Sequence, residues 1–121
     1  MKSKILLVDD DDGFRASIII CLTLEDYSVI GASNGIEALE VMLDQEIDIL
    51  ITDILMPEMD GIELALKIKK EYPQLKTIGI TGGGMLGDSE NVSKMSKAFF
   101  SSYLKKPFES NELLEKIEAL I

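Results

Sequence analysis

The chain has 121 residues, 46% of them hydrophobic, which suits one folded domain over residues 1–121. The 22 acidic and 12 basic residues give a net charge of -10, which argues against direct nucleic-acid binding because phosphate backbones are bound through basic patches. The absence of histidine excludes Ser-His and Cys-His catalytic pairs, and the one cysteine cannot form an intramolecular disulfide.

The first half of the chain alternates short apolar runs with helical stripes. Lys4–Val8 predicts a buried strand, and four acids, Asp9 to Asp12, follow it. Asp11 or Asp12 can cap the next helix, whose apolar stripe is Phe14, Ile18, Cys21 and Leu22. Ile19, Ile20 and Leu24 lie off that stripe, as extra core or as a partner-docking surface.

Tyr27–Ala32 predicts a second strand. Asn34 caps the helix after it, which is expected to bury Ile36, Leu39, Met42 and Leu43.

The second half repeats the alternation. The β-branched run from Ile47 to Thr52 predicts a third strand that ends at Asp53, and Pro57 turns the chain toward a helix over residues 61–72. Lys76–Ile80 predicts a fourth strand ending in Thr81, followed by a glycine-rich loop and a weak helix over residues 89–98. Ser102–Lys105 predicts a fifth strand. A last helix is expected to start near Ser110. Its apolar face consists of Leu113, Leu114, Ile117, Leu120 and Ile121.

Five strands alternating with five helices predict an α/β fold with a parallel sheet covered on both faces. Parallel strands deliver their carboxyl ends to the same edge, so we expect three carboxylates, a hydroxyl and an ammonium there. These groups belong to Asp9, Asp10, Asp53, Thr81 and Lys106. Carboxylates without histidine or cysteine favour Mg²⁺, Mn²⁺ or Ca²⁺, and a hydroxyl and a lysine suit phosphoryl oxygens. The pattern indicates an acceptor site for phosphoryl transfer.

Four ordered motifs carry a resemblance to a known family. They are ILLVDD at residues 5–10, DILMPEMDG at residues 53–61, ITG at residues 80–82 and YLKKPF at residues 103–108. The chain resembles the receiver domain of bacterial two-component response regulators over its whole length. That resemblance implies a doubly wound, flavodoxin-like sheet of order 2-1-3-4-5. It also implies a signalling protein that catalyses only its own phosphorylation and dephosphorylation. Because the sequence shows neither a signal peptide nor an apolar stretch long enough to span a bilayer, we expect a cytoplasmic location.

The resemblance further implies roles for individual residues. Asp53 would accept a phosphoryl group from a sensor histidine kinase or a histidine phosphotransfer protein. Mg²⁺, with Mn²⁺ as the alternative, would be held by Asp9, Asp10, Asp53 and the backbone carbonyl of Leu55. Lys106, Thr81 and Tyr103 would contact the phosphoryl group or switch with it, and the Lys106-Pro107 peptide would be cis.

Partner docking would involve Phe14, Ser17, Ile18, Pro107 and Phe108. A homodimer would use the face of helix four, strand five and helix five.

The sequence also allows other functional assignments, and it departs from the family pattern at one place. Asp10 and Asp12 also fit the nucleophile motif of haloacid-dehalogenase-type phosphatases, although the later acidic metal pair of that class is missing. A flavin-binding electron carrier is disfavoured by the four acids after strand one, and a pseudo-receiver by the intact acids. Phe99 and Phe100 stand where the family often has Gly-Ala, which leaves the packing beside strand five open.

Overall fold

Five strands alternate with helices in the computed structural model, which describes residues 3–54, 61–81 and 100–121. The strands are β1 (Lys4–Val8), β2 (Ser28–Ala32), β3 (Ile49–Asp53), β4 (Lys76–Thr81) and β5 (Ser102–Lys105). The described helices are α1 (Asp12–Leu24), α2 (Gly35–Asp44), α3 (Gly61–Glu71) and α5 (Ser110–Leu120). The helix expected over residues 89–98 lies outside the described residues.

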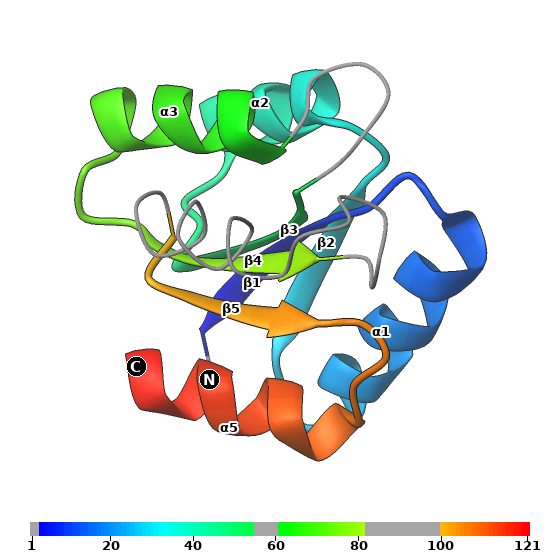
Figure 1. The fold of residues 1–121 in the computed structure, drawn as a ribbon. Coiled ribbons are helices and arrows are strands. Elements are labelled where there is room, and N and C mark those ends of the chain that lie inside the picture. Colours follow the sequence, from blue (N-terminus) through cyan, green and yellow to red (C-terminus); the bar gives the residue numbers. More distant parts are fainter. Residues whose placement is uncertain (1–2, 55–60, 82–99) are drawn as a thin grey trace.

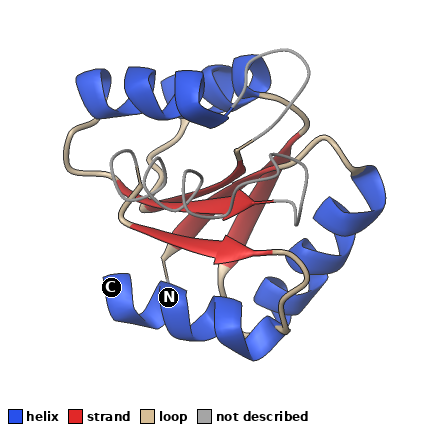
Figure 2. Cartoon of the chain, viewed as in Figure 1, coloured by secondary structure: helices blue, strands red, loops and turns tan. Residues whose placement is uncertain are grey.

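All strand pairs are parallel, and the order is β2-β1-β3-β4-β5, which confirms the predicted five-stranded sheet. Helices α2 and α3 cover one face of this sheet, and α1 and α5 cover the other (Figures 1 and 2). None of the helices in the described part of the chain is long and apolar enough to cross a bilayer.

Side chains alternate across the strands, and this alternation builds two cores. In β1, Ile5 and Leu7 pack on the side of α1 and α5, whereas Leu6 and Val8 pack on the side of α2 and α3. The same alternation in β3 and β4 supplies Ile49, Ile51, Ile78 and Ile80 to the first core. A strand buried on both faces needs apolar residues at every position, which explains the continuous apolar runs in the sequence.

Helix α1 begins beside the carboxyl end of β1. Its N-cap is Asp11, whose side chain accepts the backbone N–H of Phe14 at 3.0 Å. Ile18 and Leu22 bury its inner face, while Ile20 and Leu24 are 61% and 78% exposed. The apolar residues off the stripe are therefore divided, because Ile19 packs against the core and the other two face solvent.

The expected buried face of α2 was partly wrong. Ile36 and Leu43 are 49% and 79% exposed, whereas Met42 is buried as expected and the helix also buries Gly35 and Ala38. Small residues at the contact let a helix approach a sheet closely, so the face that packs need not hold the largest side chains. A similar correction applies to the last helix, where Ile121 is 68% exposed.

Candidate functional site

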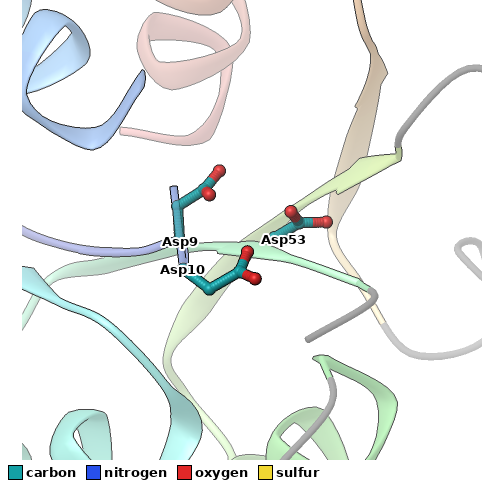
Figure 3. A group of neighbouring side chains, drawn as sticks. All are labelled: Asp9, Asp10 and Asp53. Atoms are coloured by element: carbon teal, nitrogen blue, oxygen red, sulfur yellow. The ribbon is translucent and has the colours of Figure 1, made fainter. Parts of the chain in front are cut away.

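Three carboxylates meet at the carboxyl ends of β1 and β3 (Figure 3). Val8 pairs with Thr52 in the parallel register, so the next residues, Asp9 and Asp53, lie side by side. Ligand oxygens of Asp9, Asp10 and Asp53 all lie within 4.8 Å of one another. Asp9 is fully buried and Asp53 is 8% exposed, whereas Asp10 is exposed. Such a cluster of hard oxygen ligands can hold a metal ion.

The ammonium group of Lys106 reaches this cluster from the end of β5. Its Nζ donates to Oδ2 of Asp9 at 3.2 Å and lies 3.6 Å from Oδ2 of Asp53. Asp9 also accepts the backbone N–H of Asp11 through Oδ1 at 2.8 Å, so both of its oxygens bind protein donors. Among the residues that the structure describes, three carboxylates meet one ammonium here, and this excess of negative charge favours a bound cation.

Thr81 also lies at this edge of the sheet, at the end of β4, where its side chain is on the face opposite Ile78 and Ile80. Ile78 and Ile80 belong to the core under α1 and α5, so Gly79 and Thr81 face the opposite side. The buried hydroxyl of Thr81 donates to the carbonyl oxygen of Leu104 at 3.4 Å. The acids and Lys106 thus meet at this edge, and Thr81 ends the neighbouring strand β4, where its part in the site stays a prediction. Tyr103, on β5, is half-buried.

Arg15 is a residue of this site that the sequence reasoning missed. One guanidinium nitrogen donates to the backbone carbonyl of Asp9 at 2.7 Å, and the other donates to Oδ1 of Asp12 at 2.6 Å. The side chain needs space beside β2, and Gly31 provides it, because a Cβ there would lie 3.2 Å from Cδ of Arg15. Arg15 thereby ties the loop that carries the acids to α1. The available signal was an arginine three residues after the last of four consecutive acids, and so within one helical turn of Asp12.

Replacing Arg15 with methionine is expected to lower the free energy of unfolding by about 1 to 2 kcal/mol, because the carbonyl of Asp9 loses a charged donor. Urea unfolding measures this cost. Lys116→Met, on the exposed surface of α5, is the matched control and is expected to change stability by less than about 0.5 kcal/mol. Equal costs for the two variants would show that Arg15 does not hold the loop.

Phe14 and Phe108, two of the residues expected to dock a partner, lie beside Lys106. Phe14 and Phe108 are half-buried and meet edge to face, with ring centroids 5.9 Å apart, while Ser17 and Pro107 are exposed. The Lys106-Pro107 peptide bond is cis. Ile18 is a correction, because it is 8% exposed and belongs to the core, so it offers little surface to a partner.

Sequence comparison places these features in a family. The response regulator receiver domain matches residues 5–118. The transcriptional regulatory protein GlrR of Escherichia coli (strain K12) is 37% identical over 116 residues, which cover 96% of this chain and 26% of GlrR. Response regulator MprA of Mycobacterium leprae (strain TN) is 36% identical over 118 residues, which cover 98% of this chain and 50% of MprA. The chain thus spans about a quarter to a half of the length of these relatives.

Solved structures agree with the sequence match. A response regulator receiver domain protein from Clostridium thermocellum is 31% identical with a TM-score of 0.88, covering 99% of this chain and 94% of that one. The response regulator protein TrrA from Thermotoga maritima, solved in complex with Mg(2+)-BeF, is 33% identical with a TM-score of 0.86, covering 99% and 100%. With a family match over nearly its whole length and an acidic cluster at the expected sheet edge, the chain belongs to the receiver domains of two-component response regulators.

Proposed function

We propose that Asp53 accepts a phosphoryl group from a phosphohistidine of a sensor histidine kinase or a histidine phosphotransfer protein. The observation that carries this proposal is the position of Lys106, whose Nζ lies 3.2 Å from Asp9 and 3.6 Å from Asp53 within a cluster of three carboxylates. A carboxylate oxygen of Asp53 attacks the phosphorus, and the P–N bond breaks with its electron pair passing to the imidazole nitrogen. The ammonium of Lys106 stabilises the charge on the phosphoryl oxygens.

A divalent cation is part of the proposal, with Mg²⁺ as the first choice and Mn²⁺ as the alternative. Bound Mg²⁺ would neutralise charge on the carboxylates and on the phosphoryl group. Asp10 and Asp53 are the proposed direct carboxylate ligands, and Asp9 acts through water because both of its oxygens already bind protein donors. The backbone carbonyl of Leu55 is the fourth proposed ligand, and Leu55 lies outside the described residues. The Mg(2+)-BeF complex of TrrA supports the choice of metal.

The proposal also covers regulation and partners. The chain acts as one regulatory receiver domain in the cytoplasm and catalyses only its own phosphorylation and dephosphorylation. Phosphorylation draws Thr81 and Tyr103 into a switch that alters the surface around β5 and α5. The phosphodonor docks beside α1, where Phe14 lies against Lys106 and Phe108, and where Ser17 is exposed three residues further along the helix. A homodimer through helix four, β5 and α5 remains a proposal, because helix four lies outside the described residues.

The test is the intact mass of the protein after incubation with Mg²⁺ and acetyl phosphate. We expect one added phosphoryl group, and we expect none with Asp53→Ala. An unmodified wild-type protein whose melting temperature Mg²⁺ still raises would contradict the acceptor role and would favour a pseudo-receiver that only binds partners.

A matched variant separates this proposal from the phosphatase alternative. Asp12 belongs to the same acidic run, yet its side chain is 87% exposed and pairs with Arg15, away from the three-carboxylate cluster. Asp12→Ala is therefore expected to keep the phosphoryl adduct. If Asp12→Ala instead abolished turnover of a phosphate ester while Asp53→Ala left it intact, the phosphatase assignment to Asp10 and Asp12 would replace the receiver chemistry.

A further inference from the structure

The ammonium of Lys106 lies over the face of an aromatic ring. Its Nζ is 4.1 Å from the centroid of Phe14, and it also contacts the carboxylates of Asp9 and Asp53. The face of a benzene ring carries partial negative charge, so it attracts a cation at this distance. The lysine is thus held between a ring on one side and two carboxylates on the other.

The ring of Phe14 is itself fixed from two directions. Its backbone N–H is bound by the N-cap Asp11, which places Phe14 in the first turn of α1 beside the acidic edge. Its ring packs partly against the core and meets the ring of Phe108 at an interplanar angle of 88°. Phe108 follows Lys106 by two residues, so the chain segment that carries the ammonium also holds the ring beneath it.

We propose that Phe14 is a positioning residue for Lys106, whose ammonium it holds toward the phosphoryl oxygens through a cation–π contact. This inference rests on the proposed acceptor function and adds a residue to it. A lysine side chain has four methylene groups and loses rotamer freedom when its ammonium is held in one place. A ring that restricts those rotamers in advance leaves less ordering for the transition state, where stabilisation depends on donors that are already in place.

This role differs from the docking role that the resemblance implies for Phe14. A docking residue affects transfer from a protein partner, whereas a residue that orients Lys106 also affects transfer from a small donor that has no docking surface. Acetyl phosphate therefore separates the two roles. Phe14→Leu keeps an apolar side chain and removes the aromatic face, while Phe14→Tyr keeps that face.

The first experiment measures the initial rate of phosphorylation by acetyl phosphate in Mg²⁺. We expect Phe14→Leu to lower the rate by about three- to tenfold and Phe14→Tyr to stay within about twofold of the wild type. In a Lys106→Gln background, adding Phe14→Leu is expected to change the remaining rate by less than about twofold, because the ring acts through the ammonium. A full additional loss in that background would overturn the proposal and assign Phe14 a merely structural role.

The second experiment is independent of phosphoryl chemistry. Protons of the ε-methylene group of Lys106 lie near the ring face, so their NMR signals are expected to shift upfield by the ring current. The shift should disappear in Phe14→Leu and persist in Phe14→Tyr. A wild-type protein that lacks the shift refutes the positioning role even if Asp53 is phosphorylated. A protein with the shift but without a phosphoryl adduct refutes the acceptor function instead. If Phe14→Leu does not fold, Phe14→Met replaces it in both experiments.

Discussion

Replacing Lys106 with alanine is expected to slow phosphorylation of the chain by acetyl phosphate by about 100-fold, the usual cost of removing one preorganised donor to developing charge. Lys106 contacts both Asp9 and Asp53, so the variant removes the side chain that meets two of the three carboxylates. The initial rate of adduct formation, followed by intact mass at saturating Mg²⁺, measures the loss.

The adjacent lysine provides a matched control. Lys105 ends β5 with its side chain exposed, because alternation along the strand turns neighbouring residues to opposite faces. The phosphorylation rate of Lys105→Ala is therefore expected to lie within about twofold of the wild-type rate, because most substitutions of exposed residues are nearly neutral. Loss of phosphorylation in Lys105→Ala together with retention in Lys106→Ala would reverse the assignment of the site lysine.

Lys106→Ala is expected to bind Mg²⁺ more tightly, although it is phosphorylated more slowly. Removing the ammonium leaves three carboxylates without their cationic neighbour, so the affinity of the cluster for Mg²⁺ is expected to increase. The Mg²⁺-dependent rise in melting temperature measures this affinity. Weaker Mg²⁺ binding in Lys106→Ala would mean that the lysine does not compete with the cation for the carboxylates.

Much of this arrangement was predictable because apolar runs and strand ends carry strong local signals. The bounds of β1 and β5 match the predicted strands Lys4–Val8 and Ser102–Lys105, and the acids lie at the predicted edge. The face of each side chain was harder to predict. Counting strand ends placed Thr81 at the sheet edge that carries the acids, and the alternation of β4 adds that its side chain lies on the face opposite Ile78 and Ile80. That alternation was readable from Ile78 and Ile80.

Other features depend on how surfaces fit together, which local patterns do not report. Helix α2 packs through Gly35 and Ala38, although Ile36 and Leu43 are the more hydrophobic choices. The contact of Arg15 with the carbonyl of Asp9 depends on the turn between β1 and α1 rather than on spacing. Both features were missed for the same reason. The sequence shows which residues are hydrophobic and how often they recur, whereas the shapes of two packed elements decide which residues come into contact.

The packing of Phe100 beside β5 could not be predicted from the sequence for the same reason. The structure buries its ring, 6% exposed, in a small cluster with Ile54 and Ala65. The ring lies over Gly79, where an added Cβ would be 2.8 Å from Cδ2 of Phe100. Reciprocal hydrogen bonds between Thr77 and Ser101, at 3.0 and 3.1 Å, hold the chain segment beside the ring. A large residue next to β5 is thus accommodated by the missing side chain of a glycine in β4.

Phe100→Ala is accordingly expected to lower the free energy of unfolding by about 3 kcal/mol, the usual cost of deleting a buried aromatic ring and leaving a cavity. Urea unfolding measures it. Gly79→Ala alone is expected to cost about 1 to 3 kcal/mol, because the new methyl group meets the ring and the backbone cannot relax without moving β4.

The double variant makes the pairing testable. In the Phe100→Ala background the obstacle is gone, so Gly79→Ala is expected to become stabilising by about 0.5 to 1 kcal/mol through the smaller entropy of the unfolded chain. The effect of one substitution therefore changes sign with the other, which gives a coupling free energy of at least about 1.5 kcal/mol. Equal costs of Gly79→Ala in both backgrounds would show that the ring does not occupy the space above Gly79. That result would leave the glycine without a packing reason in the middle of a buried strand.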